Sequence, residues 1–184
     1  MNALLTSGGL RNDELRQVFV SLLSKTPEET RVAVIPTASK HERNKDFLKK
    51  DIADLKLAGV HQIDMVEMSN LSKEEWLPML EACDVIFVPG GDVYYLRDEM
   101  VRSGFVDELP KLLQNKIYVG ISAGSRLLNP DISIAALYFD PAKDPQGLHV
   151  TDFCIIPHMN SDRFKDRTPD KIQELVKYFP YTTY

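Results

Sequence analysis

The chain of 184 residues contains no apolar run of 18 residues, the length that a membrane-spanning helix requires. It has only two cysteines, Cys83 and Cys154, and each lies in an apolar run without the spacing of metal ligands. The N-terminal residues lack the basic region and the long apolar stretch of a signal peptide. We therefore expect a cytoplasmic protein without a membrane partner, whose cysteines are reduced thiols in the core.

Excess charge of either sign is also small. Lys and Arg total 22 against 27 Asp and Glu, which gives a net charge of −5 and argues against nucleic acid as a partner. Hydrophobic residues make up 43% of the chain, as expected for a folded protein rather than a disordered one. At about 150 residues per domain, residues 1–184 are expected to form a single domain.

Short apolar runs alternate with helical patterns along the chain. The runs typical of buried strands are residues 3–6, 32–36, 62–68, 84–88, 117–121 and 153–156. Helical spacing of apolar residues lies between several of them, with Ser72 and Asp92 as N-caps and Pro78 as a residue that should kink or divide its helix. This alternation predicts an α/β fold of three layers, with helices on both faces of a mostly parallel sheet.

Four of the strand-like runs end in small or turn-forming residues. These ends are residues 7–9, 36–39, 89–92 and 120–124. The carboxyl ends of parallel strands meet at one edge of a sheet, which is where ligands bind. Small residues also let a backbone come close to a ligand. We expect a cleft at this edge.

The segment Gly120-Ile-Ser122-Ala-Gly124 matches the G-x-S-x-G pattern of a nucleophile elbow. Such an elbow places the serine on a sharp strand-to-helix turn, and its glycines let the strand and the helix pack against that turn. The alternative is an ordinary turn with a capping serine. An apolar strand before the segment and Arg126-Leu-Leu after it favour Ser122 as a nucleophile.

A serine nucleophile needs a base. His41 lies among charged residues, His61 opens a strand and His149 lies in a loop-like stretch. His158 instead follows the apolar run at 153–156, so we expect it near Ser122 at the carboxyl edge. A structural polar role is the alternative for His158, and its placement favours the base.

Residues 89–92, Pro-Gly-Gly-Asp, can supply backbone N–H groups to a reaction intermediate. Gly90 and Gly91, together with the N–H of Ala123, would form an oxyanion hole. A tight turn into a helix capped by Asp92 is a second interpretation, and both can hold at once. The chain has no G-x-G-x-x-G or Walker pattern, which argues against a nucleotide cofactor.

Taken together and in order, five segments resemble the peptidase E family (peptidase S51), which includes the aspartyl dipeptidases and is related to cyanophycinase. They are Leu5-Thr-Ser-Gly-Gly9, Val34-Ile-Pro-Thr-Ala38, Val88-Pro-Gly-Gly-Asp92 with Tyr95-Leu96, the elbow segment at 120–124, and Ile156-Pro-His-Met159. The resemblance implies a flavodoxin-like fold close to that of class I glutamine amidotransferases, with serine in place of their elbow cysteine. It also implies small peptides with an acidic N-terminal residue as substrates, and no metal or cofactor.

Two parts of the family pattern do not map onto the chain. The family has a proposed triad aspartate shortly after the serine, and nothing in residues 131–140 matches it; a late glutamate would lie beyond Tyr184. Because residues 179–184 are typical of a strand at its start, we expect the natural protein to continue, with a glutamate that approaches His158. The alternative is a Ser–His pair in which a backbone carbonyl or a water orients the histidine. The carboxylates available within the chain are Asp131, Asp140, Asp144, Asp152 and Asp162.

An acidic substrate also calls for a basic partner. Arg163 and Arg167 follow His158 closely, and the forked donors of a guanidinium suit a carboxylate. We expect one of the two to lie over the cleft.

The sequence favours a serine peptidase over two alternatives. An esterase of the α/β-hydrolase type would share the elbow, but only 62 residues (184 − 122) follow Ser122, too few for that fold's usual C-terminal part. A catalytically silent small-molecule-binding domain would keep the cleft, and the unmatched triad acid supports that alternative.

Overall fold

A single parallel sheet forms the centre of the molecule. The computed structural model describes residues 1–133, 144–177 and 179–184. Within these ranges five strands pair in the order β1-β5-β4-β2-β3, all parallel. The strands are β1 (Asn2–Thr6), β2 (Arg31–Val34), β3 (Gln62–Met65), β4 (Val85–Val88) and β5 (Ile117–Ile121).

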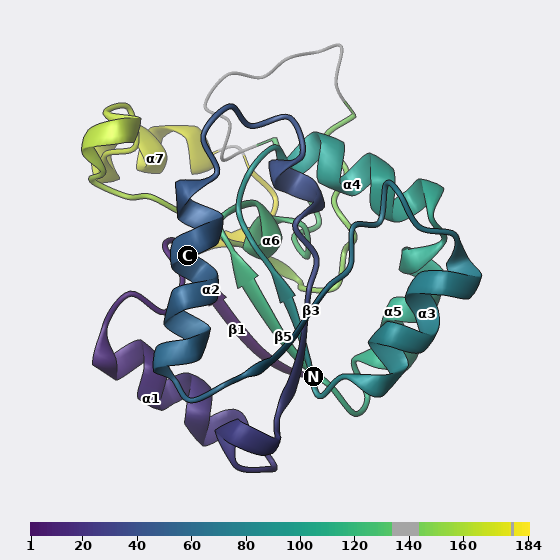
Figure 1. The fold of residues 1–184 in the computed structure, drawn as a ribbon. Coiled ribbons are helices and arrows are strands. Elements are labelled where there is room, and N and C mark those ends of the chain that lie inside the picture. Colours follow the sequence, from purple (N-terminus) through teal and green to yellow (C-terminus); the bar gives the residue numbers. More distant parts are fainter. Residues whose placement is uncertain (134–143, 178) are drawn as a thin grey trace.

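Helices connect these strands and cover both faces of the sheet (Figure 1). These helices are α1 (Asp13–Leu22), α2 (Asp46–Leu57), α3 (Lys73–Ala82), α4 (Val93–Arg102), α5 (Phe105–Leu112) and α6 (Ala123–Arg126). A further helix, α7 (Pro169–Val176), lies in the C-terminal part of the chain. In the part of the chain that the structure describes, the short 3-10 turns are η1 (Pro27–Glu29), η2 (Thr37–Ser39) and η4 (Asp162–Phe164). The three-layer α/β fold expected from the sequence is confirmed.

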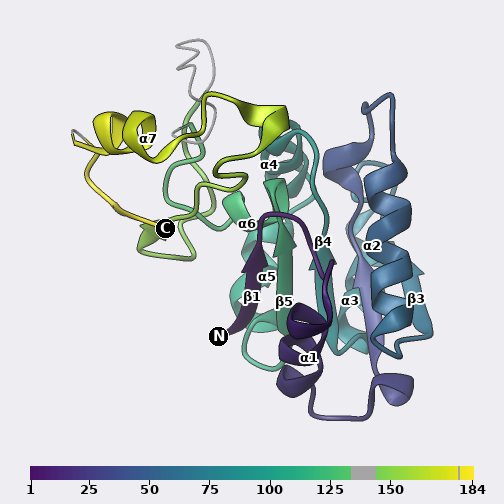
Figure 2. The same cartoon turned by 90° about the vertical axis from the view of Figure 1, so that its left-hand side faces the viewer.

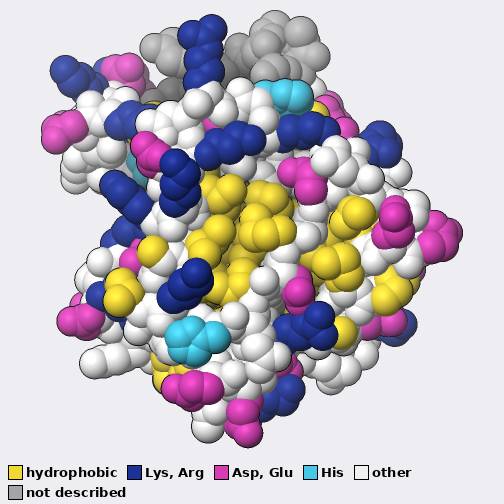
Figure 3. All heavy atoms as spheres, viewed as in Figure 1, with side chains coloured by type: hydrophobic (Ala, Val, Ile, Leu, Met, Phe, Trp, Pro, Cys, Tyr) yellow, Lys and Arg dark blue, Asp and Glu magenta, His cyan; other side chains and the backbone are white. Residues whose placement is uncertain are grey.

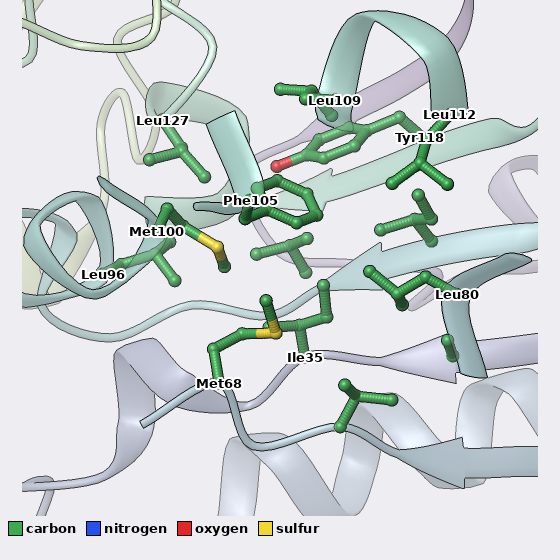
Figure 4. Packing of buried hydrophobic residues seen from close by; sticks show 14 of the residues in the cluster. Ile35, Met68, Leu80, Leu96, Met100, Phe105, Leu109, Leu112, Tyr118 and Leu127 are labelled. Atoms are coloured by element: carbon green, nitrogen blue, oxygen red, sulfur yellow. The ribbon is translucent and has the colours of Figure 1, made fainter. Parts of the chain in front are cut away.

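Two apolar cores follow from the alternation of side chains along the strands. Val32 and Val34 of β2 pack with α1 and α2 on one face, whereas Ala33 and Ile35 pack with α3, α4 and α5 on the other. Figure 4 shows the second core, in which Tyr118 of β5 lies beside Phe105, Leu109 and Leu112 of α5. Tyr118 also donates a hydrogen bond from its hydroxyl to the Gly124 carbonyl at 2.8 Å, so this core supports the turn at the end of β5.

The helices differ from the sequence interpretation in two places. Pro78 neither ends nor divides α3, because Trp76 and Leu80 on either side of it are both buried in the same core and hold the segment in one helix. Helix α5 was not expected, and it forms although Pro110 lies inside it. Its buried Phe105, with Leu109 and Leu112, provides the packing that offsets the lost backbone bond.

The apolar run at 153–156 does not join the main sheet. Its first two residues form β6 (Phe153–Cys154), which pairs in parallel with β7 (Thr182–Thr183) in a separate two-stranded sheet. Cys154 and Ile156 pack on Ile172 of α7 in a small core of their own, which accounts for the separate sheet. Figure 2 shows this C-terminal part beside β1, at the carboxyl end of the main sheet.

One face of the molecule exposes hydrophobic side chains, and both cysteines are buried. Hydrophobic side chains gather on the face between α2 and α3, where β3 is the outer strand (Figure 3). Cys83 and Cys154 are both buried and free. Within the described ranges, no helix combines the length and the apolar character needed to cross a membrane.

Candidate active site

Ser122 lies on the sharp turn between β5 and α6. Its backbone has φ 52° and ψ −103°, a region that costs a non-glycine residue free energy. Two backbone bonds hold it there: the Ser122 N–H donates to the Thr6 carbonyl at 2.9 Å, and the Arg126 N–H donates to the Ser122 carbonyl at 3.0 Å. The turn therefore presents the Ser122 hydroxyl at the carboxyl edge of the sheet.

The two glycines of the elbow are required by close packing. A Cβ atom on Gly124 would lie 1.9 Å from the Val88 carbonyl oxygen of β4, and one on Gly120 would lie 2.8 Å from the Gly124 backbone. Both distances are below 3.0 Å, closer than Cβ atoms approach other atoms in real structures. The G-x-S-x-G spacing is thus explained by the approach of α6 to the sheet.

Ser125, the residue after Gly124, links the elbow to β1. Its buried Oγ lies 2.9 Å from the Thr6 carbonyl oxygen and 2.7 Å from that of Gly120, and it accepts the Thr6 N–H at 3.0 Å. This hydroxyl therefore holds β1, β5 and α6 together below Ser122.

The structure brings His158 onto Ser122. The Ser122 Oγ lies 2.7 Å from His158 Nε2, a hydrogen-bonding distance, although 36 residues separate the two along the chain. The His158 backbone has φ 68°, and its N–H donates to the Ser7 hydroxyl at 3.2 Å. The imidazole stacks on the Phe164 ring, with centroids 4.7 Å apart and planes inclined by 19°.

The surroundings of His158 keep its imidazole neutral. Burial lowers the His158 pKa to about 4, and the positive charges of Arg167, Arg163 and Arg126 act in the same direction. At neutral pH the ring therefore has a lone pair with which to accept a proton.

The turn after β4 lies beside the Ser122 hydroxyl. Gly91 has φ 141°, and a Cβ there would lie 2.1 Å from the Ala38 carbonyl oxygen, so no other residue fits. Asp92 accepts the Tyr94 N–H at 2.9 Å as the N-cap of α4, which confirms the capping interpretation of this segment. No hydrogen bond joins the N–H of Gly91 or Ala123 to any described residue.

A cavity of about 400 Å³ opens over Ser122 and His158, and it also contacts Gly90 and Gly91. Its charged and aromatic lining comes from Arg11, Glu42, Phe47, Asp51, Arg163 and Phe164. The cavity thus brings a serine hydroxyl and an imidazole together with side chains of both signs of charge.

Sequence reasoning missed the ion pair in the cavity wall. Arg11 contacts the buried Asp51, with Nη2 and Oδ1 2.6 Å apart, and also pairs with Asp54. Burial raises the Asp51 pKa to about 7, while the charge of Arg11 opposes that shift. The sequence did contain a signal for this buried ion pair, because Asp51 and Asp54 lie next to Ile52 and Leu55 on the apolar side of a helix.

The two candidate arginines occupy different places. Arg163 lines the cavity. Arg167 is buried, its Nη1 donates to the Pro157 carbonyl at 2.7 Å, and its Cζ lies 4.3 Å from the centroid of the Phe164 ring. Only Arg163 is therefore placed to meet a ligand directly.

Among the described residues, no Asp or Glu makes a hydrogen bond to His158. Asp131 accepts from the backbone and hydroxyl of Ser133, and Asp144 pairs with Arg97 at 3.0 Å. Asp140 lies outside the described residues. In the same part of the chain, no group of three or more His, Cys, Asp or Glu is arranged to hold a metal ion.

Known proteins share both the sequence pattern and the fold. The sequence model of peptidase family S51 matches residues 3–183. The peptidase PM1590 of Pasteurella multocida, described as uncharacterized, is 31% identical over 72% of this chain and 67% of its own length. The peptidase Lin0382 of Listeria innocua, described in the same way, is 29% identical over 79% of this chain and 72% of its own length.

Solved structures agree with the sequence comparison. A Listeria monocytogenes protein assigned to peptidase E superposes with a TM-score of 0.84 at 25% identity, covering 100% of this chain and 88% of that one. A peptidase from an acI-B1 actinobacterium superposes with a TM-score of 0.72 at 18% identity, covering 98% and 76%. The family model spans nearly the whole chain, and this protein therefore belongs to peptidase family S51.

Proposed function

We propose that this protein is a serine peptidase that hydrolyses small peptides. The observation that carries the proposal is the 2.7 Å contact between Ser122 Oγ and His158 Nε2 on a strained strand-to-helix turn. Membership of a peptidase family supports a hydrolase, and the cavity of about 400 Å³ suits a substrate of a few residues.

The mechanism assigns one role to each group. Ser122 attacks the scissile carbonyl while His158 Nε2 takes its proton and then gives it to the leaving amine. The N–H groups of Gly91 and Ala123 stabilise the negatively charged oxygen of the intermediate, with Gly90 shaping the turn. Water then attacks the acyl-enzyme with His158 as base, which releases the acid product and restores the Ser122 hydroxyl.

Labelling with a fluorophosphonate probe tests the serine mechanism. The probe should modify the purified protein at Ser122, as located by mass spectrometry of the peptides. A panel of dipeptides compared with short acyl esters then separates a peptidase from an esterase. Absence of labelling, with cleavage of neither substrate class, would instead indicate the binding-domain alternative, which the lack of a carboxylate on His158 among the described residues favours.

The pH dependence follows from the low pKa of His158. The base must be neutral to accept the serine proton, so activity is lost only when the pH falls through the folded-state pKa of about 4. We expect kcat/KM to stay level from pH 8 down to pH 5 and to halve near pH 4. Arg163→Met should move this acidic limb upward, because a positive neighbour is removed. An acidic limb at or above pH 6.5 in the unmodified enzyme would contradict the assignment.

Arg163 is proposed to read an acidic N-terminal residue of the substrate. Arg163→Met should raise KM for dipeptides that begin with Asp by about tenfold, because a charge-assisted bond is lost. KM for dipeptides that begin with Ala should change little. Arg167→Met is the comparison, and it should affect both substrates equally because Arg167 is buried against Pro157. Equal effects of Arg163→Met on both substrates would show that it does not read the side chain.

A further inference from the structure

An aromatic ring covers one face of the His158 imidazole. The rings of His158 and Phe164 are nearly parallel, at 19°, and their centroids are 4.7 Å apart. Phe164 ends η4, and the short connection from His158 is closed by the Ser161 N–H, which donates to the His158 carbonyl at 3.3 Å. The local fold of this segment therefore returns the chain onto the imidazole.

Arg167 fastens the same ring in place. Its guanidinium Cζ lies 4.3 Å from the Phe164 centroid, within cation–π range, and its backbone N–H donates to the Phe164 carbonyl at 2.9 Å. The Arg167 Nη1 also donates at 2.7 Å to the carbonyl of Pro157, the residue directly before His158. Arg167 thus joins the ring to the backbone that carries the base.

A catalytic imidazole needs something to fix its plane. In a Ser-His-Asp triad a carboxylate on the second ring nitrogen does this. In the part of this chain that the structure describes, no carboxylate bonds to His158, and the Ser7 hydroxyl holds only its backbone N–H. Among the described residues, the stacked face of Phe164 is placed to limit rotation about the bond between Cβ and the ring.

We propose that Phe164 is a positioning residue for His158, and that its ring, anchored by Arg167, holds Nε2 on the Ser122 hydroxyl. The proposal rests on the proposed function, because it concerns the base of that reaction. Phe164 acts through the imidazole, so it should affect the chemical step more than substrate binding.

Phe164→Leu removes the flat ring and keeps an apolar side chain of similar volume. We expect kcat to fall about tenfold or more, since small misplacements of a catalytic group are costly, while KM changes by less than about threefold. Phe164→Tyr restores a stacking ring and should return kcat to within about threefold of the unmodified enzyme. The control is Phe19→Leu, the same substitution at a buried ring of α1, which packs in the core beside α2 and does not line the cavity. It should leave kcat unchanged.

Two further measurements test this proposal separately from the proposed peptidase activity. The rate of fluorophosphonate labelling should fall in Phe164→Leu and recover in Phe164→Tyr. The proton NMR signals of His158, assigned with His158→Gln, should be shifted by the ring current of Phe164 and should move in Phe164→Leu. This readout needs no peptidase activity, so it decides the stacking even if the unmodified protein is not labelled.

The proposal is overturned by any of three results. One is a kcat for Phe164→Leu within twofold of the unmodified enzyme, and another is a Phe164→Tyr variant as impaired as Phe164→Leu. The third is a set of His158 signals that Phe164→Leu leaves unchanged. Should Phe164→Leu not fold, the labelling rate of Phe164→Tyr and the His158 shifts of the unmodified protein still decide it.

Discussion

Replacing Ser122 by alanine should lower kcat by several powers of ten, up to about 10⁶-fold, while the protein stays folded. In the proposed mechanism this hydroxyl is the attacking group, and no other serine contacts His158 Nε2 among the described residues. Alanine keeps the backbone turn and removes a single oxygen atom, so the loss is chemical. The measurement is single-turnover cleavage of a dipeptide, with circular dichroism to verify the fold.

Ser21→Ala is the matched control for this substitution. Ser21 is an exposed serine of α1 whose hydroxyl donates only to the Val18 carbonyl, at 2.7 Å. It should leave both activity and fold unchanged. Turnover by Ser122→Ala close to that of the control would show that Ser122 is not the nucleophile.

Replacing Gly124 by alanine should strongly lower the free energy of unfolding. Its new methyl group would lie 1.9 Å from the Val88 carbonyl oxygen and 2.8 Å from the Val88 carbonyl carbon, both backbone atoms that cannot move aside alone. Helix α6 would have to shift away from β4. We expect the free energy of unfolding to fall by about 3 kcal/mol or more, with a Tm lower by roughly 10 °C.

Gly8→Ala tests whether this loss comes from the close approach. A Cβ on Gly8 would meet only the Arg11 Cγ, at 3.9 Å, which is an ordinary contact. Chemical denaturation of both variants provides the comparison, and Gly8→Ala should lie within about 0.5 kcal/mol of the unmodified protein. A Gly124→Ala variant of normal stability would mean that α6 does not pack on β4 as described.

The main sheet and the Ser122–His158 pair could be anticipated because local patterns define them. Apolar runs and terminal glycines mark β4 and β5, and the spacing of Gly120 and Gly124 follows from a backbone contact that only glycine permits. His158 was found because it follows an apolar run, although that run pairs with β7 rather than with the main sheet. The position of His158 after an apolar run was therefore informative, although the run does not belong to the main sheet.

Features that depend on contacts distant in sequence escaped prediction. The Arg11–Asp51 pair joins residues 40 apart, so the carboxylates on the apolar side of the helix do not by themselves identify Arg11 as their partner. Helix α5 forms because Phe105 and Leu109 are buried by the other layers, which local propensity around Pro110 does not reveal. The stack of Phe164 on His158 likewise depends on how the chain turns after Asn160, whose own φ is 55°.

The separate two-stranded sheet affects how long the contact between Ser122 and His158 persists. Ser122 is built into the central sheet, whereas His158 belongs to a segment secured by β6, β7 and α7, whose small core centres on Cys154, Ile156 and Ile172. Regions with little buried apolar surface open at a lower free-energy cost than the global unfolding of a domain. Transient opening of this small core would therefore move His158 away from Ser122 while β1 to β5 remain paired. Activity should therefore be lost when the less stable of the two parts opens. The rate of amide exchange in β6 and β7 should follow the loss of activity more closely than the Tm of the whole protein does.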